Sequence, residues 1–244
     1  MPVASHQIMS TVQQCLQAVR ERIVAAAAAA GRSPDDIALI AVSKTFSAGA
    51  VLEAVAAGQL AFGENYAQEG VDKIARVRAL LPEPLRRTVQ WHFIGPIQSN
   101  KTRLIAEHFD WVHSVDRLQI AQRMSQARPA GMPDLQVCIQ VNVSGEASKG
   151  GVAPEAAGGL AAALRLLPRL RLRGLMAIPR PTADITQQRA QCRILRELRE
   201  RLAQQDLVLD TLSMGMSDDL EAAIAEGATM VRVGRAIFGE RARR

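Results

Sequence analysis

The sequence predicts a single (β/α)8 (TIM) barrel preceded by one extra helix. Short apolar runs alternate with helical segments eight times along the 244 residues. The runs are apolar throughout, which is typical of parallel strands buried on both faces. No Gly/Ser-rich linker divides the chain, so we expect one domain over residues 1–244, with a leading helix at 6–31 and the barrel at 37–241. A doubly wound parallel sheet is the alternative for this pattern.

The individual elements follow from the spacing of apolar residues. The leading helix is predicted over 6–30 because Leu16, Val19 and Ile23 recur at helical spacing and Gly31 is a suitable C-cap. Proline clusters at 82–84, 129–133 and 179–181 are predicted to be turns. The predicted strands are 37–42, 60–62, 91–94, 111–115, 136–143, 172–178, 211–214 and 230–233. The intervening helices are predicted at 51–57, 66–81, 98–108, 117–127, 154–166, 186–205 and 217–226.

The charge balance at first suggests a nucleic-acid partner. Lys and Arg number 30 against 24 Asp and Glu, which gives a net charge of +6. Aromatic residues are only 3%, whereas single-strand and RNA binders stack bases on aromatic rings. The basic helix at 189–201 also contains Glu197 and Glu200, which favours a solvated face with i,i+4 ion pairs. We therefore expect no nucleic-acid partner.

The cysteines and the apolar segments indicate the compartment. Cys15, Cys138 and Cys192 are odd in number, widely spaced and without a CxxC pattern, so we expect reduced thiols and no metal site. The chain has neither a signal-peptide pattern nor an apolar run of membrane-spanning length. These features predict a cytoplasmic protein with no membrane partner.

In a barrel of this kind, function resides at the C-terminal ends of the strands. The polar and small residues at these ends are the candidate site. They are Ser43, Lys44, Glu64, Asn65, His92, Gly95, Asn142, Met176, Ser213, Arg232 and Gly234.

Lys44 is the first candidate for chemistry. Of the 30 basic residues 26 are Arg, and the four lysines are Lys44, Lys73, Lys101 and Lys149. Unlike a guanidinium, an amine can form a Schiff base. Burial at the end of an apolar strand disfavours the ammonium form and leaves a nucleophilic amine. The alternative is a lysine whose side chain simply reaches solvent.

The loops after strands seven and eight are the second candidate. Ser213–Ser217 and Arg232–Arg235 are rich in small residues, and these loops are the usual phosphate site of the fold. The alternative is that Ser217 is only the N-cap of the next helix and that the glycines only form turns. A lysine amine facing a phosphate site describes a pocket for pyridoxal 5′-phosphate (PLP).

Five motifs in order also resemble one protein family. They are Ala41–Thr45 (AVSKT), Phe62–Glu69 (FGENYAQE), Trp91–Lys101 (WHFIGPIQSNK), Leu212–Asp219 and Val231–Gly239. Over residues 8–241 the chain resembles the pyridoxal phosphate homeostasis proteins. The resemblance implies the fold type III, alanine-racemase-like barrel, and a Schiff base between PLP and Lys44. It also implies that Asn65 lies near the cofactor ring and Arg232 at the pyridine nitrogen. Ser213, Ser217, Gly234 and Arg235 are then expected at the phosphate.

The candidate residues favour a PLP carrier over an enzyme. An Arg at the pyridine nitrogen only donates, so the nitrogen stays unprotonated and the cofactor is a weak electron sink. Racemisation needs two bases, and the resemblance implies that the Tyr-bearing C-terminal domain of alanine racemases is missing. We expect PLP homeostasis without robust turnover. A low-activity amino-acid racemase or lyase and a Schiff-base aldolase acting on a phosphosugar are the alternatives.

Three of the remaining candidates, Lys149, Lys101 and His92, have two interpretations each. Lys149 either accepts the aldehyde from Lys44 or is a loop lysine in water, and Lys101 either attracts phosphate or is a surface charge. Lys73, in mid-helix, is expected to be solvated. His92 either faces the cofactor ring or is a buried, hydrogen-bonded histidine. The partners expected are PLP and apo forms of PLP-dependent enzymes, with the chain as a monomer.

Overall fold

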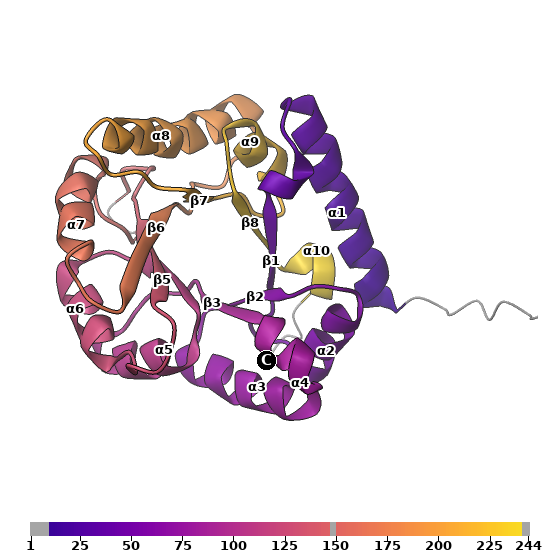
Figure 1. Ribbon diagram of the computed structural model, residues 1–244. Coiled ribbons are helices and arrows are strands. Elements are labelled where there is room, and N and C mark those ends of the chain that lie inside the picture. Colours follow the sequence, from indigo (N-terminus) through magenta and orange to yellow (C-terminus); the bar gives the residue numbers. More distant parts are fainter. Residues whose placement is uncertain (1–9, 147–149, 241–244) are drawn as a thin grey trace, which may run out of the picture.

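Eight parallel strands close into a barrel in the computed structural model, which describes residues 10–146 and 150–240 (Figure 1). The strands follow one another in chain order, and β8 pairs with β1 over Ala38–Ala41. The (β/α)8 prediction is therefore confirmed, and the doubly wound sheet is wrong because such a sheet stays open. The strands are β1 (Ala38–Val42), β2 (Ala61–Glu64), β3 (Gln90–Phe93), β4 (Trp111–Val115), β5 (Leu135–Gln140), β6 (Leu170–Met176), β7 (Thr211–Ser213) and β8 (Met230–Val233).

Helices surround the barrel, and each predicted helix has a counterpart. The described residues contain two further helices: α10 follows β8, and α4 begins within a proline cluster that predicted only a turn. Proline is tolerated at the start of a helix, where its missing N–H is not needed: Pro82 is the N-cap and Pro84 lies in the first turn. The helices are α1 (Thr11–Ala29), α2 (Ala48–Ala56), α3 (Ala67–Leu80), α4 (Glu83–Thr88), α5 (Thr102–His108), α6 (Leu118–Ala127), α7 (Ala157–Leu164), α8 (Ile185–Ala203), α9 (Leu220–Ala225) and α10 (Arg235–Phe238).

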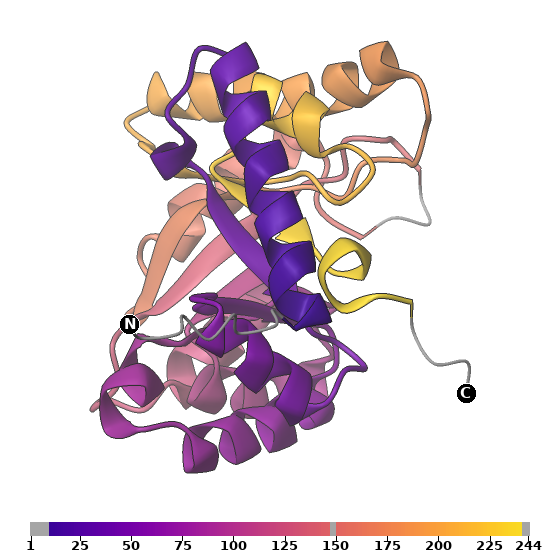
Figure 2. The ribbon, with the colours of Figure 1, turned by 90° about the vertical axis from the view of Figure 1, so that its right-hand side faces the viewer.

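The leading helix α1 lies outside the barrel beside β1 and β8 (Figures 1 and 2). It begins after Ser10, whose hydroxyl accepts a hydrogen bond from the N–H of Gln13. Its buried face, which includes Leu16, Val19 and Ile23, packs in a layer with α2, α9 and α10. Because α10 has only four residues, α1 supplies most of the helical cover at this side of the barrel.

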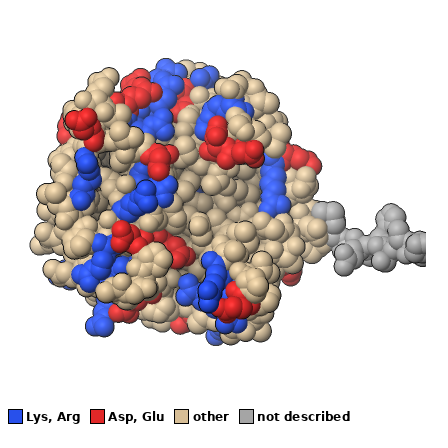
Figure 3. All heavy atoms as spheres, viewed as in Figure 1, with Lys and Arg blue, Asp and Glu red and all other residues tan. Residues whose placement is uncertain are grey.

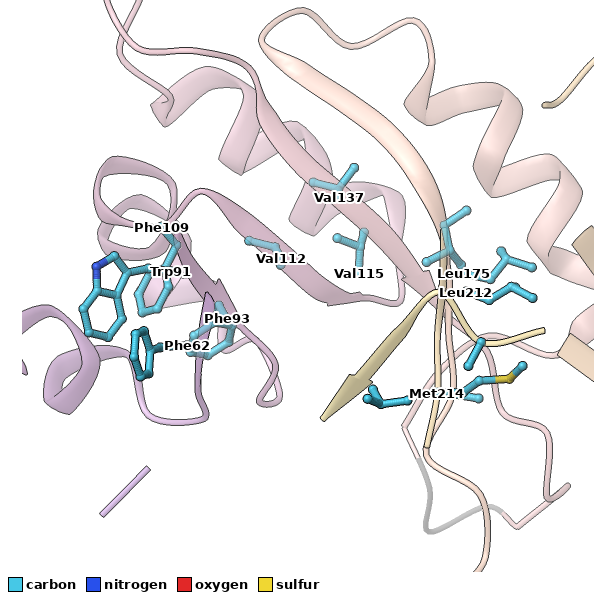
Figure 4. Close-up of a cluster of buried hydrophobic side chains, with 14 of the residues drawn as sticks. Phe62, Trp91, Phe93, Phe109, Val112, Val115, Val137, Leu175, Leu212 and Met214 are labelled. Atoms are coloured by element: carbon cyan, nitrogen blue, oxygen red, sulfur yellow. The ribbon is translucent and has the colours of Figure 1, made fainter. Parts of the chain in front are cut away.

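The core is apolar and continuous across the sheet and the helices. Figure 4 shows an aromatic group of Phe62, Trp91, Phe93 and Phe109 on one side and aliphatic residues around Leu175 on the other. Phe62 and Trp91 lie with ring centroids 5.6 Å apart. Phe62 on β2 is paired with Trp91 on β3, so this contact joins two neighbouring strands of the barrel.

All three cysteines are free thiols, as expected. Cys138 and Cys192 are buried, and burial raises the pKa of each thiol to about 12. They therefore pack as small apolar side chains.

The outer surface is charged and mixed. Figure 3 shows basic and acidic side chains interspersed over one face of the molecule. Among the described residues, no helix combines the length and apolar character needed to cross a lipid bilayer.

Candidate functional site

A pocket of about 920 Å³ opens at the C-terminal ends of the strands. It brings together Lys44 after β1, Asn65 after β2, Arg232 on β8, and the loops after β7 and β8. Of the predicted site residues, Ser213 does not line it. The lining residues are Val42, Lys44, Asn65, Ile94, Ile178–Ala183, Gln188, Met216–Asp219, Arg232, Gly234 and Arg235.

Lys44 is half-buried in a tight turn that directly follows β1. The N–H of Ser43 donates to Gly63 O at 2.9 Å, which continues the ladder with β2. The N–H of Phe46 donates back to Ser43 O at 3.1 Å and closes the turn. The lysine stem therefore starts from backbone that is fixed to two strands.

Arg232 is buried, with 4% of its surface exposed, and it reaches the pocket from inside β8. Its Nη1 donates to Ser213 Oγ at 2.7 Å and its Nη2 donates to Ala177 O at 2.9 Å. Burial lowers the pKa of Arg232 to about 10, so the guanidinium is still charged at neutral pH. Arg232 is thus a fixed cationic donor, and its burial excludes a solvated surface charge.

Behind Arg232, Ser213 and two histidines form a buried chain of hydrogen bonds. Ser213 Oγ lies 2.7 Å from His113 Nδ1, and His113 Nε2 lies 2.9 Å from His92 Nδ1. Arg232 can only donate, so the hydroxyl of Ser213 accepts from Arg232. In the two contacts that follow, the tautomer of each ring sets which nitrogen donates and which accepts. Both histidines are neutral in this chain.

The histidine environment explains this neutral state. Burial lowers the pKa of His92 to about 3, and burial, His92 and Arg232 together hold the pKa of His113 well below its usual range. Neither histidine lines the pocket. Of the two interpretations of His92, the buried, hydrogen-bonded histidine is therefore the one seen.

Ser213 was expected at a phosphate, but the structure places it elsewhere. It is fully buried and is occupied by Arg232 and His113. The reason is that Ser213 is still within β7, where its side chain points into the barrel, whereas the loop begins beyond it. Its role here is to hold Arg232.

Asn65 lines the pocket just after β2, and its Oδ1 is buried without a hydrogen-bond partner in the described structure. Its backbone lies against Gly95, where a Cβ atom would stand 2.1 Å from Asn65 O. Only glycine allows this approach, so Gly95 sets the position of Asn65.

The loops after β7 and β8 form one wall of the pocket. The expected helix start at Ser217 is wrong: α9 begins at Leu220 after Asp219, whose Oδ1 accepts the N–H of Met216 at 2.6 Å. Ser217 therefore lies in the loop and lines the pocket, and it does not cap the helix. Arg235 lies at the rim, 66% exposed, and pairs with Asp218 at 3.4 Å.

Sequence reasoning missed another wall of the pocket, formed by residues 178–183. The proline cluster at 179–181 predicted a turn, but its place just after β6 was the available signal for the site. Gln188 of α8 fixes this wall, because its Nε2 donates to Thr182 O at 2.8 Å and to Asp218 O at 3.1 Å.

The other candidates lie outside the pocket lining. Asn142 organises the loop after β5, where its Nδ2 donates to Glu146 O, and Met176 is buried. Lys101 is half-buried at the end of a short 3₁₀ helix, and Lys149 lies outside the described residues. Lys73 was expected to be solvated, which is wrong: only 5% of its surface is exposed, because it is paired with carboxylates behind Lys44.

The fold and the pocket define the class of this protein. It is a (β/α)8 barrel with a lysine after the first strand and small residues in the loops after the last two strands. Residues 14–242 match the family described as "Alanine racemase, N-terminal domain". The chain is 62% identical to a pyridoxal phosphate homeostasis protein of Pseudomonas aeruginosa (96% of this chain, 97% of the relative). It is 54% identical to the protein of the same name from Escherichia coli K12 (96% and 98%). The chain therefore belongs to the pyridoxal phosphate homeostasis protein family.

A solved structure agrees with this assignment. PipY of Synechococcus elongatus PCC7942, described as having PLP bound, is 35% identical to this chain. It superposes with a TM-score of 0.80 over 93% of this chain and 100% of the PipY chain.

Proposed function

We propose that this chain binds PLP in the pocket at the strand ends and serves intracellular vitamin B6 homeostasis, holding the cofactor on Lys44 without robust turnover. One observation carries the proposal. The Lys44 amine, the buried Arg232 guanidinium and the loops after β7 and β8 line a single pocket of about 920 Å³. The names of the relatives and the PLP described in PipY support the same function.

The residues present fit the three polar parts of PLP. Bound PLP supplies an aldehyde carbon that condenses with an amine to a C=N bond and releases water. Lys44 is the amine of the pocket, and Arg232 is the donor for the pyridine nitrogen. Ser217, Gly234 and Arg235 would face the phosphate, where Gly234 lets the backbone approach. Asn65, with its unpartnered buried Oδ1, would face the ring.

The same residues support a carrier in place of an efficient enzyme. Arg232 cannot give up its proton near neutral pH, so it stabilises an unprotonated pyridine nitrogen and weakens electron withdrawal by the ring. Among the described residues that line the pocket there is no His or Tyr to act as a second base beside Lys44. Tyr66 is 54% exposed and does not line the pocket. These features disfavour racemisation, which needs a base on each face of the substrate.

The proposal extends to location and partners. We take the protein to be cytoplasmic and monomeric, and the receivers of PLP to be apo forms of PLP-dependent enzymes. The interspersed surface charges in Figure 3 give no basic patch on that face for nucleic acid, and no membrane partner is part of the proposal.

Absorption spectroscopy tests the binding proposal. Purified protein incubated with PLP should show an absorption band at about 420 nm that Lys44→Ala abolishes. Lys101→Ala is the matched control and should keep the band. A wild-type protein that stays colourless would overturn the proposal.

A second measurement tests the absence of robust turnover. The PLP-loaded protein is incubated with L-amino acids in deuterated water, and α-proton exchange is followed by NMR. Slow exchange, close to that of free PLP, is expected. Rapid exchange that requires Lys44 would support the racemase alternative instead.

A further inference from the structure

Three charged side chains lie behind Lys44 and outside the pocket lining: Glu64 at the end of β2, and Glu69 and Lys73 on α3. Lys73 Nζ donates to Ser43 O at 2.6 Å, to Glu64 Oε1 at 2.7 Å and to Glu69 Oε1 at 3.1 Å. An ammonium has three N–H donors, and all of them are engaged here. Lys73 is therefore not a second nucleophile for an aldehyde but a cross-link.

This cluster holds the residues on both sides of Lys44. Before it, the carbonyl of Ser43 accepts from Lys73, and the hydroxyl of Ser43 donates to Glu64 Oε1 at 2.6 Å. After it, the N–H of Thr45 donates to Glu69 Oε1 at 2.5 Å. The Lys44 side chain thus projects from a backbone segment that is held at each end by the same ion-paired group.

The backbone of the turn shows why it needs such support. Thr45 has a φ of 69°, in the left-handed region that β-branched residues rarely adopt. A conformation of this kind persists only when the surroundings enforce it, and it concentrates at functional sites. The bond from Thr45 N–H to Glu69 is the contact that enforces it here.

Stability alone does not explain the cluster, because burying its charges costs free energy. Glu64 is fully buried, and its Oε2 has no hydrogen-bond partner in the described structure. Burial raises the pKa of Glu64 against the opposing effect of Lys73. Apolar residues of similar volume would fill the space at a lower cost in free energy. We therefore relate the charged groups to the backbone turn that they contact.

We propose that Lys73, Glu64 and Glu69 are positioning residues that hold the turn Ser43–Phe46 so that the Lys44 amine faces the pocket. The proposal rests on the proposed function, because a positioned amine matters only where it captures an aldehyde. None of the three is proposed to touch the cofactor.

Glu69 offers the sharpest test, because its side chain is 29% exposed and its replacement leaves the core intact. Glu69→Ala removes the acceptor for Thr45 N–H, whereas Glu69→Gln keeps an oxygen there. Glu69→Ala should weaken PLP binding, followed at 420 nm, about tenfold, as expected for one charge-assisted hydrogen bond. Glu69→Gln should stay within about threefold of wild type, and the pH profile of the band should shift only in Glu69→Ala.

A double variant separates positioning from general damage. Glycine adopts a positive φ without strain, so adding Thr45→Gly to Glu69→Ala should restore part of the lost affinity. Glu107→Ala, which breaks the exposed i,i+4 pair with Arg103, is the matched control and should bind PLP like wild type. Wild-type affinity and pH profile in Glu69→Ala and in Lys73→Met would overturn the proposal.

Hydrogen exchange in the PLP-free protein keeps the two proposals distinguishable. The Thr45 amide should be protected in wild type and Glu69→Gln and should exchange at least about tenfold faster in Glu69→Ala. If wild type binds no PLP but the protection follows this pattern, the proposed function is wrong, while the stabilisation of the turn by Glu69 is supported. If exchange of the Thr45 amide does not depend on Glu69, the proposal that Glu69 holds the turn is wrong.

Discussion

Arg232 and Ser213 are joined by a buried hydrogen bond of 2.7 Å from Nη1 to Oγ, between neighbouring strands β8 and β7. The bond gives Ser213 a supporting role, because its buried hydroxyl links the guanidinium of Arg232 to the ring of His113. It also gives Arg232 a fixed orientation at the floor of the pocket.

Replacement of Ser213 should therefore act on stability first. Ser213→Ala leaves an Arg232 N–H and Nδ1 of His113 without partners in a buried place. We expect the free energy of unfolding, measured with urea on the PLP-free protein, to fall by about 1–3 kcal/mol. Ser217→Ala, in the pocket wall, should instead weaken PLP binding and leave stability nearly unchanged. Equal effects of the two variants on stability would contradict the separate roles of these serines.

The buried histidines make the protein sensitive to acid. The imidazole of an unfolded chain has a pKa of about 6.5. In the folded protein, burial lowers the pKa of His92 to about 3. The unfolded state thus binds more protons, and stability should fall as the pH falls from about 6.5 toward 3. The slope is up to about 1.4 kcal/mol per pH unit for His92. Urea unfolding at pH 7, 6 and 5 should show a shallower slope in His92→Gln, and an unchanged slope would refute the assignment.

Gly95→Ala should disturb both the fold and the site. The added Cβ would stand 2.1 Å from Asn65 O, so the backbone after β2 or β3 has to move. We expect a loss of about 1–3 kcal/mol in thermal or urea unfolding, together with weaker PLP binding because Asn65 shifts. Gly159→Ala is the control: it is exposed within α7 with open space around it, and it should stabilise by about 0.5–1 kcal/mol. Similar stability changes in both variants would contradict the steric argument.

Glu226 at the end of α9 should be a stability determinant. It is fully buried from solvent and accepts hydrogen bonds from Arg189 at 2.8 Å and Arg193 at 3.1 Å. It also forms an ion pair with Arg196 at 3.2 Å, and all three arginines are on α8. The basic face of this helix, expected to be solvated, is thus partly directed at one carboxylate. Burial alone favours the neutral acid, but hydrogen bonds from Arg193 and Arg189 hold the pKa of Glu226 below its usual value.

We expect Glu226→Gln to lower the free energy of unfolding by about 1–3 kcal/mol near neutral pH. Because the folded pKa is depressed, the difference from wild type should shrink as the pH falls below about 4. Glu221→Gln, which weakens the exposed pair with Arg22 at 2.9 Å, should cost at most about 1 kcal/mol. A smaller loss in Glu226→Gln than in Glu221→Gln would contradict this account.

Much of the fold could be predicted because apolar periodicity is a local property. All eight strands were predicted, since parallel strands buried on both faces appear as apolar runs. Lys44, Asn65, Arg232 and Gly234 were found because the barrel collects strand ends at one rim. Element ends were less accurate: α9 begins at Leu220 because Asp219 bonds to Met216, a contact that no periodicity reports.

Apolar runs and local motifs were enough to predict the barrel, the lysine at the end of the first strand and the family. The residues behind that lysine come together only when the chain folds. Lys73 and Glu64 are nine residues apart in the chain, and Ser213 and His113 are a hundred apart. Whether such residues are solvated, buried or paired depends on closure of the barrel, which brings distant strands together and removes water. For this reason local patterns predict a solvated Lys73 and a Ser213 at the phosphate, whereas in the folded chain Lys73 contacts Ser43 beside Lys44 and Ser213 contacts Arg232.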